Sequence, residues 1–320
     1  MNDVVIEAIN LHKSFGSKKS VDGISFEVIK GEVFGYLGHN GSGKTTTIRL
    51  ILGLLKPDSG TVSLLGQNPY PDSSYTQQLH RRIGVLLEKD AVYHNMTGWE
   101  NLIYWAQLYG LSGADAARCV NETIDIVRIR ENSQSLTRTY SKGMRRQLAI
   151  ARALLCQPEV LFLDEPTSGL DPIARVRVRT IMENLVSSGK CTVFLSSHDL
   201  EEVEKLCKRV LIIENGRKVI SGTVAELRKP HSKLAIQLKP SNGCYLAESL
   251  YHKVEMLPYV RSLELRSDFL FLKLDEPDMI TNIINLLVSS GASIIDIKRN
   301  MRSLEDAYND ILSSHGSDLK

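Results

Sequence analysis

A segment near the N-terminus has the residue types and the spacing of a loop that binds phosphate. Glycines let backbone N–H groups turn inward around phosphate oxygens, where a Cβ atom would collide. Lys44 adds a full positive charge, and the hydroxyl of Thr45 can ligate Mg²⁺. A chance glycine turn need not lie between a strand and a helix, as this segment is expected to do. We therefore predict a nucleotide site formed by Gly38, His39, Asn40, Gly41, Ser42, Gly43, Lys44, Thr45 and Thr46.

Two adjacent carboxylates follow a short apolar run further along the chain. Asp164 and Glu165 come directly after Val160–Leu163. At the carboxyl end of a parallel strand they would face the phosphate loop across the ligand crevice. Asp164 could then hold Mg²⁺ through water, and Glu165 could polarise the attacking water. Strand ends are often polar, so this pair predicts a site only together with the phosphate loop.

These motifs need a scaffold that holds several strand ends together. Up to about residue 227, short apolar runs alternate with helix-like segments, which predicts an α/β fold with a mainly parallel sheet covered by helices. A strand over Gly31–Leu37 and a helix over Thr45–Leu55 are expected on either side of the phosphate loop. The continuous apolar runs Val160–Leu163 and Cys191–Leu195 are typical of strands that are buried on both faces.

The pattern changes twice along the chain. From Thr97 to about Arg130 it is helical. The stretch Lys229–Ser232 is typical of a linker, and strands and helices beyond it follow an α+β pattern. We therefore predict an α/β domain over residues 1–228 and a small α+β domain over residues 229–320. The second domain should contain strands over Leu263–Leu274, a helix over Met279–Leu287, a strand over Ser293–Lys298 and a helix from Leu304.

The composition is that of an ordinary globular protein. Hydrophobic residues make up 42% of the 320 residues, charged residues make up 24%, and the formal net charge is +2. Such a balance gives no electrostatic reason to expect nucleic acid as a partner. The five cysteines are scattered, which favours free thiols in a reducing cytoplasm. The N-terminus does not have the pattern of a secretion signal, and no apolar run is long enough to span a bilayer, so work at a membrane would require a partner.

The segment around the two carboxylates resembles one protein family. The run Asp164–Pro172 is similar to the Walker B motif and D-loop of ATP-binding cassette (ABC) ATPases. The other motifs of the family follow in order, with Phe15 where an aromatic residue stacks on adenine, Tyr140–Met144 in the place of the signature motif and His198 in the place of the switch histidine. The resemblance covers about residues 4–227. It implies a P-loop ABC ATPase domain with a helical subdomain, and ATP and Mg²⁺ as cofactors.

The resemblance also implies a dimer, here a homodimer of nucleotide-binding domains. Each ATP would contact the phosphate loop of one domain, and Ser141 and Gly143 of the other domain, with Asp171 in the D-loop. A helix beginning at Lys142 would present free N–H groups and a positive dipole end there. An ordinary helix start with Ser141 as N-cap is the alternative. Lys142 departs from the commonest signature and could either approach the γ-phosphate or remain solvated.

Three other positions carry roles that the resemblance implies. Glu88 stands where the family has a glutamine that contacts Mg²⁺ or the attacking water, and we expect it to act as that sensor. His198 is expected at the γ-phosphate, although a lone surface histidine at a helix start would have the same sequence. Phe15 could instead be a core residue. Arg145, Arg146 and the run Arg175–Arg179 are expected to be solvated.

The expected function is that of an ATP-hydrolysing subunit of an ABC transporter. A separate transmembrane permease would form the substrate path, and the subunit would lie at the cytoplasmic face of the membrane. The alternatives are a soluble ABC-type mechanochemical ATPase acting on ribosomes or DNA, and a nucleotide-binding regulator without turnover. The segment Ser303–Tyr308 resembles the tail of a small accessory domain in drug- or antibiotic-exporter ATPases, which favours export. That domain would be either a packing or dimer-stabilising appendage or a regulator.

Overall fold

A computed structural model of the protein describes residues 3–70, 74–87, 90–189, 191–228, 232–239, 246–275, 277–300 and 303–315. The chain divides into two compact units, which we call unit 1 (Met1–Thr223) and unit 2 (Val224–Lys320). The sequence predicted two domains, over residues 1–228 and 229–320. That these are separately folding domains stays a prediction. Within the described residues, no helix is long and apolar enough to cross a membrane.

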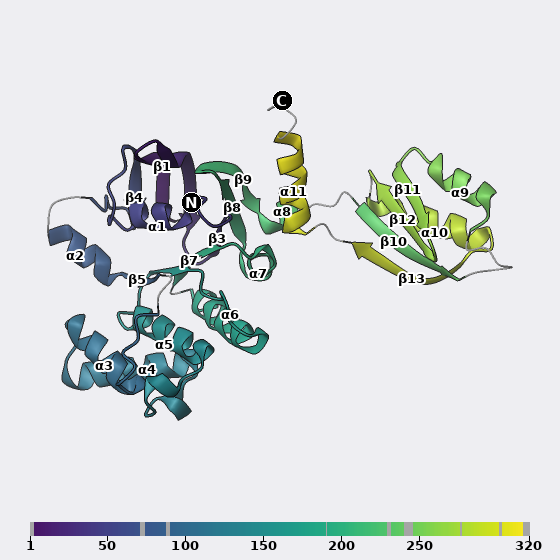
Figure 1. Ribbon diagram of the computed structural model, residues 1–320. Helices are drawn as coiled ribbons and strands as arrows, with labels where there is room; N and C mark the ends of the chain where they lie inside the picture. Colours follow the sequence, from purple (N-terminus) through teal and green to yellow (C-terminus); the bar gives the residue numbers. More distant parts are fainter. Residues whose placement is uncertain are drawn as a thin grey trace. The chain divides into compact units, whose positions relative to one another are not determined.

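The central sheet of unit 1 is mostly parallel, as predicted (Figure 1). Its order is β5-β6-β7-β3-β8-β9, and β9 alone among these strands runs antiparallel to its neighbour. All five residues of β3 and of β6 are buried, because helices and a second sheet cover both faces. The strands are β3 (Val33–Leu37), β5 (Ile83–Leu86), β6 (Val160–Asp164), β7 (Thr192–Ser197), β8 (Arg209–Glu214) and β9 (Arg217–Thr223).

A second, antiparallel sheet precedes and follows the phosphate loop in sequence. Its order is β2-β1-β4, with β1 (Val4–Phe15), β2 (Lys18–Ile29) and β4 (Ser59–Leu64). One hydrophobic core joins this sheet, the helix α1 (Lys44–Ile51) and the central sheet. Aromatic rings of Phe26, Phe34 and Phe194 lie 5.6 to 6.1 Å apart in it. This packing fixes α1, and therefore the loop before it, against the ends of the central strands.

The predicted helical region forms two helices with a break between them. α3 (Gly98–Leu108) begins with a capping box, in which Thr97 accepts from the backbone of Glu100 and the Glu100 side chain accepts from Thr97. The chain then turns through Gly110, whose φ is +85°. The remaining helices of unit 1 are α2 (Ser74–Arg81), α4 (Gly113–Val127), α5 (Lys142–Leu154), α6 (Pro172–Ser187) and α7 (Leu200–Leu206), with 3-10 turns at Arg130–Asn132 and Thr137–Thr139.

Unit 2 has the β-α-β-β-α-β order of a ferredoxin-like domain. Its antiparallel sheet has the order β11-β12-β10-β13, and side chains of α9 and α10 pack on one face of that sheet. The elements are α8 (Val224–Leu227), β10 (Ser232–Lys239), α9 (Glu248–Glu255), β11 (Val260–Arg266), β12 (Phe269–Leu274), a 3-10 turn (Pro277–Met279), α10 (Ile280–Ser289), β13 (Ser293–Asn300) and α11 (Leu304–His315).

Candidate functional site

A cavity of about 1200 Å³ lies where three central strands of unit 1 end. The loop after β3, the end of β6 and the residue after β7 all contribute to its wall. The structure therefore brings together residues that lie more than a hundred positions apart in the sequence. The predicted site residues in the wall are Asn40, Gly41, Gly43, Lys44, Thr45, Thr46, Asp164, Glu165 and His198.

The phosphate loop has two positions, Gly38 and Gly43, where a Cβ atom would collide with neighbouring atoms. Gly43 has φ +110°, and a Cβ atom there would collide with the carbonyl oxygen of Ser20. A Cβ atom at Gly38 would collide with Ser42 and with the backbone of Ile213. α1 begins directly after Gly43 without a side-chain cap, so its first N–H groups are available to an anion. The buried Ser42 hydroxyl has no hydrogen-bond partner among the described residues, which also fits a cradle for a ligand.

Lys44 is buried at the centre of this cradle. Its Nζ donates to the carbonyl oxygens of Gly38 (2.7 Å) and His39 (3.3 Å) and lies 3.3 Å from Oε1 of Glu165. The side chain is only 7% exposed, so its charge is poorly screened by water. An anion entering the cavity would meet this ammonium group directly.

Asp164 and Thr45 meet as the sequence predicts for a metal site. The Thr45 hydroxyl donates to Oδ2 of Asp164 at 3.0 Å, and the Ser196 hydroxyl donates to Oδ1. Hydroxyl and carboxylate oxygens are ligands that Mg²⁺ accepts, usually together with water and phosphate oxygens. In the described part of the chain, no cluster of three or more His, Cys, Asp or Glu could hold a metal by itself. The donor set therefore fits a Mg²⁺ that arrives with a nucleotide.

Glu165 connects the phosphate loop with His198. Its Oε2 lies 2.8 Å from Nδ1 of His198, on the opposite oxygen from the one beside Lys44. The residue has φ +51°, a left-handed conformation that is uncommon outside glycine, and its N–H donates to Ser196. Strained backbone of this kind occurs at functional sites, where it aims a side chain. A carboxylate held here could accept a proton from water at the γ-phosphate position.

Several predicted residues lie outside the cavity wall. Ser141 caps α5, accepting from the N–H of Met144 at 3.2 Å, and Asp171 caps α6, accepting from Ala174 at 2.9 Å. Gly143 permits close packing of α5 on α6, because a Cβ atom there would lie 2.7 Å from that of Ala174. Within a single chain, Ser141 and Asp171 cap helices and Gly143 allows two helices to pack closely. Their contact with ATP across a dimer stays a prediction.

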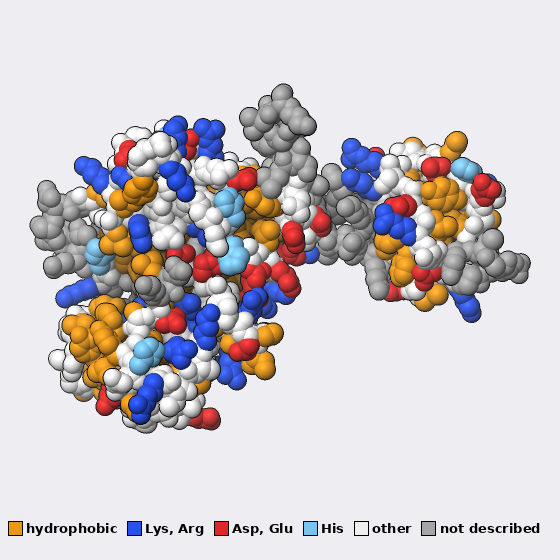
Figure 2. All heavy atoms as spheres, in the orientation of Figure 1, with side chains coloured by type: hydrophobic (Ala, Val, Ile, Leu, Met, Phe, Trp, Pro, Cys, Tyr) orange, Lys and Arg blue, Asp and Glu red, His pale blue; other side chains and the backbone are white. Residues whose placement is uncertain are grey.

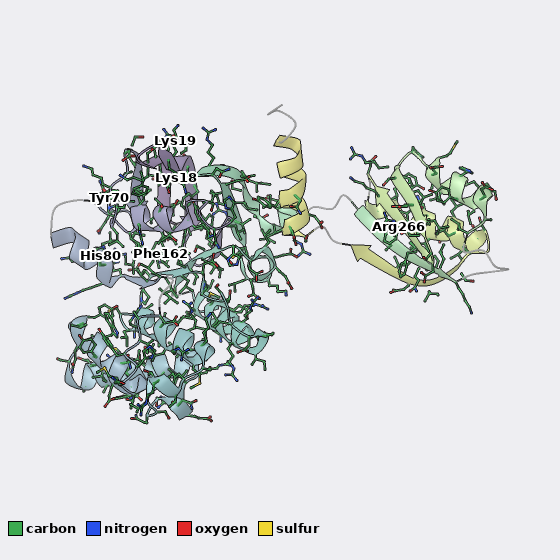
Figure 3. All side chains as sticks on the ribbon, viewed as in Figure 1. Lys18, Lys19, Tyr70, His80, Phe162 and Arg266 are labelled. Carbon is green, nitrogen blue, oxygen red and sulfur yellow. The ribbon has the colours of Figure 1, made fainter. Side chains whose placement is uncertain are left out.

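Phe15 lies at the surface and not in the core. Its side chain is 53% exposed, and the Lys13 ammonium is 5.9 Å from the centre of its ring. Phe15 pairs with Lys18 across the β1-β2 hairpin, and Lys18 lies in the cavity wall. Figure 3 marks Lys18 and its neighbour Lys19 on this hairpin. His39 turns its Nδ1 toward the carbonyl oxygen of Asn40 (2.8 Å), and the Glu88 prediction lies outside the described residues.

Sequence reasoning was wrong about Arg146, which is buried, and about Arg175 and Arg179, which are partly buried in ion pairs, whereas Arg177 is exposed as expected. Arg146 is 4% exposed and lies 3.2 Å from Asp90, because α5 turns that face toward the segment after β5. Arg175 and Arg179 pair with acidic residues of α7 and its cap. The alternating arginines gave no indication of these ion pairs, because the acidic partners lie 23 and 24 positions away in the sequence.

Some residues in and beside the wall gave no motif in the sequence. Ser20 and Lys18 reach the cavity from β2, and Ser196 holds Asp164 from the neighbouring strand. Lys142 also lies in the wall, and its ammonium group occupies the space that a side chain at Gly169 would need. The two sequence-based alternatives for Lys142 were approach to phosphate and solvation. Lys142 lies beside both the cavity and Gly169, and its approach to phosphate stays a prediction.

Comparisons with known proteins agree with this geometry. Residues 21–168 match the family model described as ABC transporter. The bacitracin transport ATP-binding protein BcrA of Bacillus licheniformis is 34% identical over 305 residues, which are 95% of this chain and 96% of the relative. The Nod factor export ATP-binding protein I of Sinorhizobium fredii is 35% identical over 312 residues, which are 96% of this chain and 85% of the relative. The chain belongs to the ABC transporter family.

The fold of this ABC subunit is also found in solved structures. That of cbiO1 from Clostridium perfringens, part of the ABC transporter complex cbiONQ, has a TM-score of 0.66 and 24% identity, and covers 70% of this chain and 90% of that one. The predicted α/β ABC ATPase fold is confirmed. The subunit binds ATP and is an ATPase that serves transport, and the relatives favour this function over a soluble mechanochemical ATPase.

Proposed function

We propose that this ABC subunit binds ATP with Mg²⁺ in the cavity and that Glu165 is the general base for hydrolysis. Lys44 and the N-terminus of α1 would hold the β- and γ-phosphates, and Thr45 and Asp164 would hold the metal. Bound Mg²⁺ would neutralise charge that develops on the phosphate oxygens. His198 would orient the Glu165 carboxylate and donate toward the γ-phosphate. Glu88 remains our candidate for the sensor of that phosphate.

One observation carries this proposal. The Glu165 carboxylate lies 3.3 Å from the Lys44 ammonium group and 2.8 Å from the His198 ring. Lys44, Glu165 and His198 therefore lie close together, although they follow three different strands, β3, β6 and β7. Such a set can contribute to binding a triphosphate and to activating water beside it.

We further propose a separate transmembrane permease as partner, with this subunit at the cytoplasmic face of the membrane. Figure 2 shows hydrophobic side chains gathered over the region of α3. Tyr93, Tyr104, Leu108 and Tyr109 are between 37% and 58% exposed there. An exposed apolar patch of this kind is typical of a protein interface. Export, rather than import, is supported by relatives that are named for bacitracin transport and Nod factor export.

A homodimer completes the proposed site. Ser141, Gly143 and Asp171 of a second copy would meet the ATP from the opposite side, since a single chain keeps them out of the cavity wall. Unit 2 would stabilise this dimer or regulate it. The Glu165→Gln variant should then form an ATP-dependent dimer that size-exclusion chromatography separates from the monomer. A variant that stays monomeric with ATP and Mg²⁺ would contradict the dimer.

Copurification tests the transport function itself. Tagged protein would be isolated from detergent-solubilised membranes of its source, and bound proteins would be identified by mass spectrometry. We expect one multi-spanning membrane protein in stoichiometric amount. A matched preparation carrying Tyr104→Asp and Leu108→Asp in the apolar patch should lose it while keeping ATP binding. Recovery of ribosomal or DNA-repair proteins without a membrane protein would contradict the proposal.

A further inference from the structure

Arg175 joins two segments that flank the proposed catalytic residues. It lies in the first turns of α6, where its Nε donates to the backbone carbonyl of Leu170 at 3.2 Å. Its Nη1 donates to Oδ2 of Asp199 at 3.1 Å. A guanidinium group can do this because it presents several donors in a fixed planar arrangement.

The Leu170 end of this bridge leads back to Glu165. The N–H of Ser168 donates to the carbonyl of Glu165, and the N–H of Leu170 donates to that of Thr167, both at 3.2 Å. Two consecutive turns therefore connect Leu170 to the strained residue that carries the carboxylate. Movement of the Leu170 carbonyl would be passed to Glu165 through a short, hydrogen-bonded stretch of backbone.

The Asp199 end leads to His198. Asp199 caps α7 by accepting from the N–H of Glu202 at 3.1 Å, and its own N–H donates to the hydroxyl of Ser197 at 3.0 Å. The His198 side chain is 48% exposed, so packing alone does not fix it. Its orientation depends on the backbone beside Asp199 and on its 2.8 Å contact with Glu165.

We propose that Arg175 is a positioning residue that sets the geometry between Glu165 and His198. The contacts form a closed ring, from Glu165 through the turns to Leu170, across Arg175 to Asp199, and through His198 back to Glu165. A ring holds two side chains in register better than either segment alone. Small displacements at a reacting centre lower rates steeply, so the ring acts on turnover more than on binding. This inference rests on the proposed roles of Glu165 and His198.

The competing explanation is that the Arg175–Asp199 pair only stabilises the packing of α6 against α7. A second ion pair between these helices provides a matched control. Arg179 lies one turn further along α6 and pairs with Glu202 of α7 at 2.6 Å. That pair is more buried, with side chains 19% and 10% exposed against 36% and 29% for Arg175 and Asp199. The hydrogen bond described for Arg179 goes to Glu202 and not to the residues beside Glu165 or His198.

The test compares Arg175→Gln with Arg179→Gln in the full-length protein. For Arg175→Gln we expect kcat to fall about 10-fold while KM for ATP stays within about 2-fold, since the residue orients and does not bind. For Arg179→Gln we expect unchanged kcat per folded molecule and a lower midpoint of thermal unfolding, because buried Glu202 loses its partner. Equal kcat in the two variants would overturn the proposal.

A double-mutant cycle adds a readout that a structural role would not change. Asp199→Asn keeps a good helix cap but loses the charge that Arg175 binds. We expect Arg175→Gln with Asp199→Asn to be no slower than Arg175→Gln alone, because both break the same ring. Multiplying effects on kcat would overturn the proposal, since they would mean that the two residues act separately.

Two reference variants distinguish this inference from the function on which it rests. If Glu165→Gln and His198→Ala lose turnover while Arg175→Gln keeps wild-type kcat, the positioning role is wrong and the catalytic roles stand. If Glu165→Gln hydrolyses ATP at the wild-type rate, the proposed general base is wrong, whatever Arg175→Gln does.

Discussion

The two units of this ABC subunit place their polar groups in opposite ways. Every buried polar or charged side chain among the described residues belongs to unit 1, and they include Lys44, Asp164 and Glu202. In the described part of unit 2 the buried side chains are all hydrophobic. Its charges lie outside, as in the surface pair of Arg266 with Glu264 on β11, where Figure 3 marks Arg266.

This difference separates a scaffold from a site. Burying a charge costs free energy unless partners compensate for it, so a fold that only needs stability leaves charges outside. Unit 1 keeps buried charges beside glycines with positive φ and beside strained Glu165, which stability alone would not favour. Unit 2 depends on alternation along its strands, where Leu270, Leu272 and Leu274 all face the core.

Glu165→Gln should give the largest contrast between the units. Removing the proposed base should lower kcat by a factor of about 10² or more while ATP binding persists, because the amide cannot accept the proton. Glu264→Gln in unit 2 is the control and should leave kcat unchanged. Steady-state phosphate release and nucleotide binding by equilibrium titration measure the two effects. Normal turnover by Glu165→Gln would mean that another group activates the water.

A core deletion in unit 2 should have the opposite signature. Ile283 in α10 is fully buried among strand residues, so Ile283→Ala should lower the unfolding free energy of unit 2 by about 2–5 kcal/mol. ATP binding to unit 1 should not change, if the units fold independently. Hydrogen exchange of the α10 amides and nucleotide titration give the two measurements. A matching loss of ATP affinity would show that the units unfold together.

Alanine substitutions at one glycine in each unit compare the cost of a side chain at a positive φ angle. Gly43 and Gly291 both have positive φ, but a Cβ atom collides with Ser20 only at Gly43, and the space around Gly291 is open. Gly43→Ala should introduce backbone strain of about 1–3 kcal/mol, and the collision with Ser20 adds to this cost. We therefore expect ATP binding to weaken at least tenfold. Gly291→Ala should cost only about 1 kcal/mol of stability in unit 2 and leave ATP binding intact. Equal effects on ATP affinity would contradict the role of the Gly43 backbone.

Local patterns were enough to predict much of the scaffold and of the site. The buried strands β6 and β7 were expected from continuous apolar runs, and the phosphate loop from its glycine spacing, because each signal lies within a few residues. The antiparallel sheet β2-β1-β4 was not predicted. Its strand β4 pairs with β1 across some fifty residues, and several bulges in β1 disturb the alternation that would reveal it.

Contacts made through the tertiary fold were the part that sequence could not supply. Arg146 and Arg175 looked like solvated positions, because their acidic partners come from other elements. Ser196 holds Asp164 only because β6 and β7 are neighbours in the sheet. Residues that belong to a motif could therefore be predicted from the sequence, whereas contacts between distant elements could not.

The smallest expected contrast is a pH dependence that belongs to unit 1. Burial raises the pKa of Cys191 from 9.0 to about 12 and also raises that of Cys207, while the described part of unit 2 contains no cysteine. Above about pH 9 the thiols of Cys191 and Cys207 lose their protons in the unfolded chain but keep them in the folded chain.

The two thiols should therefore not change the unfolding free energy of unit 1 below pH 9. Above pH 9, each thiol should lower that free energy by about 1.4 kcal/mol per pH unit. Urea unfolding from pH 8 to 10.5 measures this slope, and a Cys191→Ala, Cys207→Ala double variant should show a shallower one. An equal slope in the variant would mean that other groups, such as Tyr36, whose pKa burial also raises, cause the loss.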